Sequence, residues 1–353
     1  MSPEWLNERD LPQWDRFVLE QKDGLVYHTS AWKRAVEGAF PHIEGNFLVL
    51  REGPNAPIRA GIPIYTVKSW LLGTRLISIP FATLANPLVS SPNDTAQLLN
   101  WLSPAVARST DANIELRGLR NADALTSAGF RESSAFKHHF IRLDRSFDEL
   151  SASFSRTAVR RMVAKALKSG VTIQKGASPA DLNQFYELFV QSRRRLELPP
   201  IPRAFFESLW KEFAPENLLL LLAMVDGRPV GGVIGINLKE HFFLEYSGEV
   251  DGVQKIGVNQ LLYWEAVREA IDRRCREFSF GRTSLDNVGL IQYKRHWGTV
   301  EEDLSVFTWT REKGELTAPR ESSAQYKLVK HLAAMTPMPL FRLLGKFCYS
   351  HWG

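Results

Sequence analysis

Two pairs of short apolar segments, one pair in each half of the chain, predict β-hairpins. In the first half, residues 47–52 and 58–65 surround a turn that contains Gly and two Pro residues. In the second half, residues 219–225 and 230–236 surround an Asp-Gly-Arg-Pro turn. The chain therefore repeats one local pattern, as a tandem pair of related domains does.

Each hairpin precedes a segment with helical periodicity and then a late strand. We expect helices over residues 95–108 and 258–273, and strands over residues 136–143 and 304–309 that close the first and second halves. This order is typical of an α/β fold in which helices cover a mixed sheet. The expected parts are an N-terminal domain of residues 1–147, a C-terminal domain of residues 148–320 and a tail of residues 321–353.

The composition is that of a globular protein with two domains. A chain of 353 residues, 44% of them hydrophobic and 24% charged, has enough apolar residues for two ordinary cores. Cys275 and Cys348 match no metal-binding spacing and no redox motif, and the first residues lack an apolar export signal. The longest apolar run, residues 218–225, is too short to cross a bilayer. We therefore expect a cytoplasmic protein.

The formal net charge of +5 is concentrated in two segments, the first of which is a helix that opens the second half. Residues 156–168 contain five cations and no acid, beside an apolar stripe at i, i+3, i+4 and i+7. Two interpretations are open: a solvated helix face, or a ridge that binds a phosphate-bearing partner.

The second basic segment is the C-terminal tail. From Ser322 onward it contains four cations and no acid among many apolar residues, and Pro337 and Pro339 divide it into two short helices. Such a segment either packs on the protein or lies on the anionic inner face of the cytoplasmic membrane.

Five short motifs follow one another along the second half. They are residues 160–171 (RRMVAKALKSGV), 246–251 (YSGEVD), 257–264 (GVNQLLYW), 280–283 (FGRT) and 293–298 (YKRHWG). In this order they resemble the Fem-type (FemAB-like) branch of the GNAT acyltransferase superfamily, and His28-Thr-Ser-Ala-Trp32 resembles the helix entry near the N-terminus of that family. The resemblance implies two tandem GNAT-like domains with mixed sheets flanked by helices, in agreement with the internal repeat.

The resemblance also implies acyl transfer to an amino group of a cell-envelope precursor. In the best-known members, an amino acid moves from aminoacyl-tRNA to the peptide of a peptidoglycan intermediate. This chain lacks their long helical arm and is more similar to Fem-like proteins associated with exopolysaccharide export. We expect an anionic, nucleotide- or lipid-linked saccharide precursor as acceptor, with transient contact to a tRNA donor and none to DNA. A CoA-dependent N-acetyltransferase of a small amine and a non-catalytic assembly factor are the alternatives.

Lys294 and Tyr246 are the expected catalytic residues. The lysine of the family's aromatic-Lys-x-x-Trp-Gly motif is implicated in stabilising the tetrahedral intermediate of acyl transfer, and the counterpart of Tyr246 contacts the acceptor. The alternatives are a surface lysine beside a packed Trp297 and a half-buried strand tyrosine. We leave the general base open, because the spacing of Glu245, Glu249, Asp251 and Asp286 singles out none of them.

The expected substrate-binding residues are cationic or aromatic. Arg282 follows a glycine and has the fork geometry that clamps phosphate, unless it pairs with a carboxylate such as Asp286. Arg160 and Lys165 would extend the same anion site, and Trp32 belongs to the N-terminal motif.

The acyl donor depends on one loop. Ordinary GNAT enzymes hold the CoA pyrophosphate on a Gly-containing loop at a helix start, and only Gln254 and Gly257 match that pattern here. Asn259, where a minimal side chain is usual, is also suited to capping the helix. We therefore expect no required cofactor and leave the donor open between aminoacyl-tRNA and acyl-CoA. We expect no metal, because His138 and His139 would point to opposite faces of a strand.

Overall fold

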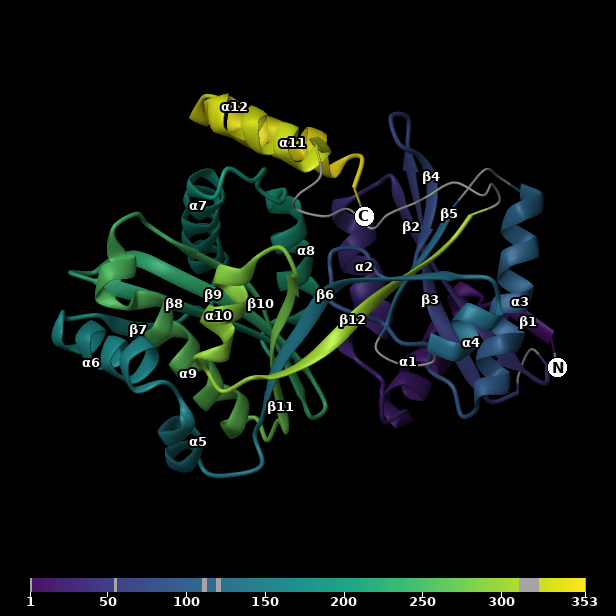
Figure 1. Ribbon diagram of the computed structural model, residues 1–353, viewed down its shortest axis with the longest axis horizontal. Helices are drawn as coiled ribbons and strands as arrows, with labels where there is room; N and C mark the ends of the chain where they lie inside the picture. Colours follow the sequence, from purple (N-terminus) through teal and green to yellow (C-terminus); the bar gives the residue numbers. More distant parts are fainter. Residues whose placement is uncertain (1, 54–55, 110–112, 119–121, 311–323, 353) are drawn as a thin grey trace. The chain divides into compact units, whose positions relative to one another are not determined.

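The computed structural model describes residues 2–53, 56–109, 113–118, 122–310 and 324–352. Its contacts divide the chain into two units (Figure 1). Unit 1 comprises Met1–Phe136, Glu302–Arg320 and Tyr349–Gly353, and unit 2 comprises Lys137–Glu301 and Glu321–Cys348. These units do not coincide with the expected ranges 1–147 and 148–320, because strands β6 and β12 each have residues in both units.

The sheet of unit 1 has the order β1-β2-β3-β4-β5-β12. All neighbours are antiparallel except β4 and β5, which are parallel. Its strands are β1 (Ser2–Trp5), β2 (Ile43–Arg51), β3 (Ala60–Ser69), β4 (Gly73–Ile77), β5 (Asn113–Gly118) and β12 (Val300–Trp309). Its helices are α1 (Leu11–Glu20), α2 (Ser30–Ala39), α3 (Pro92–Ser109) and α4 (Ala122–Ser127).

The sheet of unit 2 has the order β6-β11-β10-β9-β8-β7. Strands β7 to β10 form an antiparallel meander, and β10 pairs with β11 in parallel. Its strands are β6 (Arg131–Arg142), β7 (Thr172–Lys175), β8 (Leu218–Val225), β9 (Arg228–Leu238), β10 (His241–Glu249) and β11 (Glu277–Ser284).

Helices cover the sheet of unit 2. They are α5 (Phe147–Ser153), α6 (Arg161–Lys168), α7 (Pro179–Arg195), α8 (Arg203–Phe213), α9 (Val258–Asp272), α10 (Val288–Arg295), α11 (Ala324–Met335) and α12 (Met338–Tyr349). A π-helical turn, η3 (Arg156–Arg160), precedes α6, and a 3₁₀ turn, η4 (Val253–Ile256), precedes α9. The expected basic helix is therefore a π-helical turn that continues into an α-helix.

The predicted α/β class with mixed sheets is confirmed, and so is the repeated hairpin. The first hairpin is β2 and β3, and the second is β8 and β9. In each unit a helix, α3 or α9, then connects two parallel strands. The two halves of the chain thus share one arrangement, a hairpin followed by a helix between parallel strands. The same apolar pattern in each half favours the same strand pairing.

Both late strands lie in the other unit from the one expected: residues 137–142 of β6 lie beside β11 in unit 2, and residues 302–309 of β12 lie beside β5 in unit 1. The strand expected over residues 304–309 was assigned to the second half, but β12 pairs antiparallel with β5 over Ser305–Trp309. Phe307 of β12 is 1% exposed and belongs to the core of unit 1. The assignment was wrong because the period of a strand shows which side chains are buried and does not show which partner the strand takes.

The tail packs on unit 2 through one side of its helices. Phe341 of α12 is fully buried under the guanidinium of Arg194, which also donates to the carbonyl oxygen of Ala333. Gly345 lies against Pro200, where a Cβ would overlap the carbonyl oxygen. The packing interpretation of the tail therefore holds for this side of the two helices.

Candidate functional site

Strands β10 and β11 part from each other after a short parallel contact. They pair only over His241–Phe243 and Glu277–Ser279, and a bulge follows in β10 between Leu244 and Tyr246. Space between the carboxyl ends of parallel strands is where open α/β sheets bind ligands. The bulge re-aims the side chains of the second half of β10 into that space.

A cavity of about 240 Å³ lies in unit 2 at this position. Four elements contribute its lining: the end of α7, the end of β10, the start of α9 and α10. The lining residues are Ser192, Arg195, Leu196, Ser247, Gly248, Glu249, Asn259, Tyr263, Leu290 and Tyr293. The wall is polar and apolar in equal measure, with one cation and one carboxylate.

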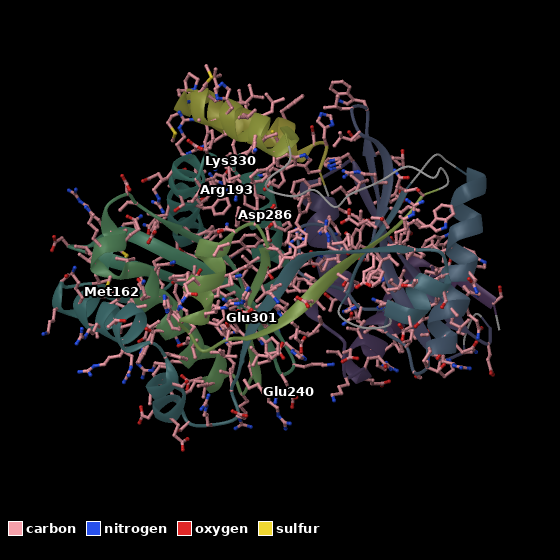
Figure 2. All side chains as sticks on the ribbon, in the orientation of Figure 1. Met162, Arg193, Glu240, Asp286, Glu301 and Lys330 are labelled. Carbon is pink, nitrogen blue, oxygen red and sulfur yellow. The ribbon has the colours of Figure 1, made fainter. Side chains whose placement is uncertain are left out.

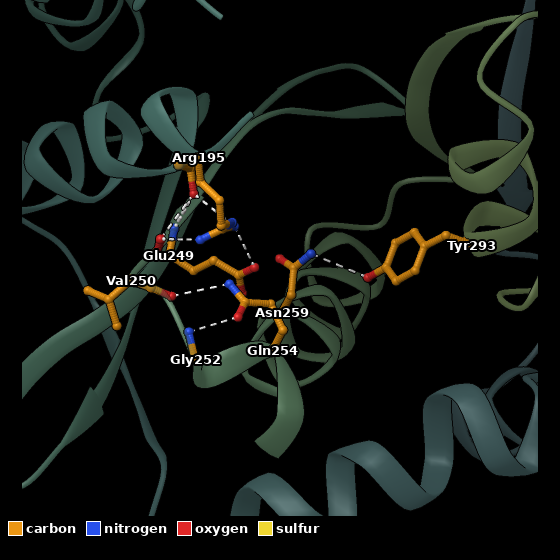
Figure 3. Close-up of polar contacts among 8 residues, drawn as sticks. Arg195, Glu249, Val250, Gly252, Gln254, Asn259 and Tyr293 are labelled. Atoms are coloured by element: carbon orange, nitrogen blue, oxygen red, sulfur yellow. Dashed lines mark hydrogen bonds and ion pairs between the residues drawn. The ribbon is translucent and has the colours of Figure 1, made fainter. Parts of the chain in front are cut away.

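Glu249 is the carboxylate of this cavity, and its side chain is only partly paired. Its Oε1 accepts a hydrogen bond from Arg195 at 3.0 Å, and its Oε2 is buried without a partner (Figure 3). Its backbone is also held, because its N–H donates to Ser192 Oγ at 2.8 Å. Burial raises the pKa of Glu249, although the Gln254 side chain and Arg195 oppose this shift. A fixed carboxylate with a raised pKa is suited to accept a proton near neutrality.

Hydroxyl and amide groups line the rest of the cavity. Asn259 Nδ2 donates to the Tyr293 hydroxyl at 3.4 Å (Figure 3). Burial raises the pKa of both Tyr263 and Tyr293, so both phenols keep their protons and remain hydrogen-bond donors. Donors of this kind stabilise negative charge that develops on an oxygen atom.

Lys294 lies next to Tyr293 in the chain but does not line the cavity. Its Nζ donates to the carbonyl oxygens of Gly281 and Arg282 on β11, at 3.1 and 3.2 Å. The side chain is buried, and burial lowers the pKa of Lys294 to about 7, although the charge of Glu245 opposes this shift. The ammonium is therefore easily converted to the neutral amine.

Two buried histidines lie on the same side of unit 2 as Lys294. His138 and His139 are on β6, and burial lowers the pKa of each to about 4, with the nearby Lys294 also lowering them. His138 Nε2 is 2.8 Å from Ser279 Oγ. Both rings are therefore neutral at pH 7 and add no positive charge beside Lys294.

Three other expected site residues lie away from the lining of the cavity. Tyr246 is buried, with its ring edge against Phe206 and Phe205. Trp32 is 0% exposed on α2 in the core of unit 1, so its ring contributes to packing there. Arg282 lies on β11, where its carbonyl oxygen holds Lys294. Of the expected residues, Lys294 is in direct contact with Arg282, and Gly257 donates a backbone hydrogen bond of 3.2 Å to Gln254.

The remaining expected residues surround the start of α9. The Gln254 side chain accepts from Gly252 N–H and donates to the Val250 carbonyl oxygen, so it closes the turn before the helix (Figure 3). Gly257 has a φ of +86° and lies directly against the carbonyl oxygen of Met162 on α6 (Figure 2). Helix α6 therefore packs against the start of α9.

The exposed cations of η3 and α6 flank the start of α9. Arg160 donates through Nε to the Phe154 carbonyl oxygen at 3.2 Å and is exposed, as is Lys165. Neither residue forms an ion pair within the described ranges. The ridge is therefore free to meet an anionic partner.

The sequence analysis did not identify most of the residues that line the cavity. Ser192, Arg195, Tyr263 and Tyr293 were not proposed as site residues, and Asn259 was considered only as a cap or as part of a CoA loop. The available signals were the motifs of residues 257–264 and 293–298, which contain Asn259, Tyr263 and Tyr293, and the Arg193-Arg-Arg195 run at the end of α7. Within the described residues, no cluster of three or more His, Cys, Asp or Glu side chains could hold a metal ion, and no helix is both long and apolar enough to cross a membrane.

Comparisons with known proteins agree with this architecture. Residues 153–295 match the family model of the acetyltransferase (GNAT) domain. No curated protein matches the chain. The crystal structure of FemX superposes with a TM-score of 0.71 at 14% identity, covering 94% of this chain and 100% of FemX.

Two further solved structures are similar. L-PGS from Bacillus licheniformis has a TM-score of 0.60 at 14% identity and covers 94% of this chain and 99% of its own. A tandem GNAT protein from the clavulanic acid biosynthesis pathway has a TM-score of 0.57 at 12% identity and covers 89% of this chain and 100% of its own.

The family match defines residues 153–295 as an acetyltransferase domain of the GNAT class, and the fold of the whole chain agrees with it. Within that class its fold is the Fem-like form, as in FemX, and residues 153–295 form the GNAT domain that carries the cavity. The resemblance drawn from the sequence motifs is thereby confirmed.

Proposed function

We propose that the chain transfers an acyl or aminoacyl group to an amino group of a nucleotide- or lipid-linked precursor of the cell envelope or of an exopolysaccharide. The observation that carries this proposal is the partly paired carboxylate of Glu249 in the cavity that α7, β10, α9 and α10 line. Acyl transfer to an amine needs a proton acceptor at this point, because the nitrogen becomes cationic as it attacks.

The reaction then follows from the lining groups. The amine nitrogen attacks the acyl carbonyl carbon, a C–N bond forms, and the carbonyl oxygen becomes an oxyanion. Glu249 takes the proton from the nitrogen, and hydroxyl or amide donors such as Asn259 and Tyr263 are placed to stabilise the oxyanion. Collapse of the intermediate breaks the bond to the leaving group of the donor, which departs with a proton. Lys294 of α10, which donates hydrogen bonds to carbonyl oxygens of β11, adds positive potential when it is protonated.

The exposed cations suggest the class of substrate. Arg160 and Lys165 belong to a segment of five cations without an acid, which suits the phosphates of a nucleotide- or lipid-linked saccharide or of a tRNA donor. FemX and L-PGS share the fold of this chain.

Replacement of Glu249 tests the proposal. Glu249→Gln should lower the rate of acyl transfer by about 10²- to 10⁴-fold, because the amide cannot accept the proton. The matched control is Asp251→Asn, which neutralises an exposed carboxylate two residues further on. The measurement is mass spectrometry of envelope and exopolysaccharide precursors from cells that carry each variant or none. Equal product from wild type and Glu249→Gln would contradict the proposal.

A second candidate is a CoA-dependent N-acetyltransferase of a small amine, which the description of the matching GNAT family favours. The contact of Gly257 with Met162 opposes it, because α6 covers the start of α9. Thermal-shift measurements with acetyl-CoA and with uridine-diphosphate sugars distinguish the two. A ligand at 100 times its Kd stabilises the folded state by about 2.7 kcal/mol. Stabilisation by acetyl-CoA alone would favour this second candidate.

A further inference from the structure

The outward side of helices α11 and α12 is apolar, although the inward side packs on unit 2. Seven large apolar side chains on the two helices are between 46% and 68% exposed. They are Leu328, Leu332, Met335, Met338, Leu340, Leu343 and Phe347. Figure 2 shows side chains that project from the two helices away from α7. We call these seven residues the tail face.

Helical spacing places most of the tail face in two continuous stripes. Leu328, Leu332 and Met335 follow at i, i+4 and i+7 on α11, and Leu340 and Phe347 at i and i+7 on α12, with Leu343 between them. The buried residues Ala333 and Phe341 lie on other sides of the same helices. The exposed stripes are therefore separate from the packed side and do not result from incomplete packing.

Cations accompany the stripes. Lys327 and Lys346 are exposed, and neither forms an ion pair in the part of the chain that the structure describes. Two other cations pair across to unit 2: Lys330 with Glu197 at 3.5 Å, and Arg342 with Glu187. These pairs fix the orientation of the helices, while the free lysines add positive charge beside the apolar stripes.

We infer that the tail face lies in the surface of an anionic phospholipid bilayer, with the two helices parallel to the membrane plane. Leu, Met and Phe beside Lys are the composition of helices that lie in the membrane interface. Contact surfaces between proteins are instead depleted in Lys, which accompanies the stripes here. Each lysine without an ion pair increases the affinity of the protein for anionic headgroups. This inference stands independently of the proposed acyl transfer, since it concerns where the protein binds and not what it catalyses.

Flotation with vesicles tests the inference on the full chain. Vesicles of phosphatidylglycerol and phosphatidylcholine in equal parts should carry the protein upward in the gradient. Vesicles of pure phosphatidylcholine should bind at least about tenfold less protein. The double variant Leu343→Ser/Phe347→Ser should lower partitioning to the anionic vesicles by about tenfold or more. Lys327→Gln/Lys346→Gln should lower it by a similar factor, and added salt should lower it further. Failure of the wild type to bind anionic vesicles would overturn the inference.

Three controls separate the tail face from other surfaces. Leu19→Ser removes an apolar side chain of similar exposure, 51%, on α1 and should leave binding unchanged. Trp70→Ser/Leu71→Ser alters another exposed apolar site, and Arg161→Gln/Lys168→Gln alters the cationic ridge. If either of these two double variants abolishes binding while the tail variants bind like wild type, the inference is overturned.

The tail face could instead be covered by a second copy of the chain. Analytical sedimentation without lipid tests this alternative by measuring the oligomeric state. A monomer, or a dimer that the tail variants do not affect, is the expected result. A dimer that Leu343→Ser/Phe347→Ser dissociates would overturn the inference. Far-UV circular dichroism of each variant confirms that the replaced side chains, which are exposed, do not alter folding.

Discussion

Burial of Lys294 in the folded chain makes its positive charge unfavourable in free energy. The side chain is 6% exposed and only two carbonyl oxygens accept from its ammonium group, so its pKa falls from the ordinary 10.5 to about 7. Between these two values the unfolded chain holds a proton that the folded chain has released. Stability therefore rises as the pH rises from about 7 towards 10, and the free energy involved is on the order of a few kcal/mol.

Lys294→Met should remove this dependence. The methionine keeps most of the volume of the side chain but has no proton to lose, so we expect the free energy of unfolding to change less between pH 7 and pH 10 than in the wild type. Urea unfolding at several pH values measures the slope. Lys255→Met, at an exposed lysine of η4, is the control and should keep the wild-type slope. Equal slopes for Lys294→Met and wild type would contradict the burial argument.

Helices α6 and α9 approach each other at Gly257, and a side chain there has no room. The residue has a φ of +86°, and a Cβ would overlap the Met162 carbonyl oxygen. Gly257→Ala should therefore lower the free energy of unfolding by about 2–4 kcal/mol, from backbone strain and overpacking together.

Gly252 provides a matched comparison for this contact. Its φ is +88°, but nothing lies within 4 Å of an added Cβ, so Gly252→Ala should cost only about 1–2 kcal/mol of strain. Urea unfolding of the two variants measures the difference. An equal loss in the free energy of unfolding for both variants would show that the packing of α6 against the start of α9 does not contribute to the cost of Gly257→Ala.

Unit 1 depends on a strand that follows unit 2 in the sequence. Phe307 of β12 lies in the unit 1 core, so Phe307→Ala should destabilise that unit by about 3–5 kcal/mol. Hydrogen exchange should show lost protection in β4 and β5. Phe278→Ala in β11 is the counterpart in the unit 2 core and should act on β10 and β11 instead. Loss of protection confined to residues 148–301 in Phe307→Ala would contradict the assignment of β12.

The local sequence pattern was sufficient to predict several helices and strands of the chain and its α/β class. Apolar periodicity and turn residues predicted both hairpins, the helices α3 and α9 and the division of the tail at its prolines, because helices and strands depend on neighbours a few residues away. The ordered motifs from residue 160 to residue 298 also identified the Fem-like acyltransferase class.

The tertiary structure decided the partner of β12 and the chemistry of the cavity. Four carboxylates near the motifs were equivalent in sequence, and only folding buries Glu249 beside Arg195, 54 residues earlier in the chain. Burial shifts the pKa of a group because surrounding atoms displace water from it. Those atoms come from segments that are distant in the sequence, so the shift follows only from the tertiary structure. The same holds for the tail, where the sequence predicted amphipathic helices but only packing against α7 determined which side remains exposed.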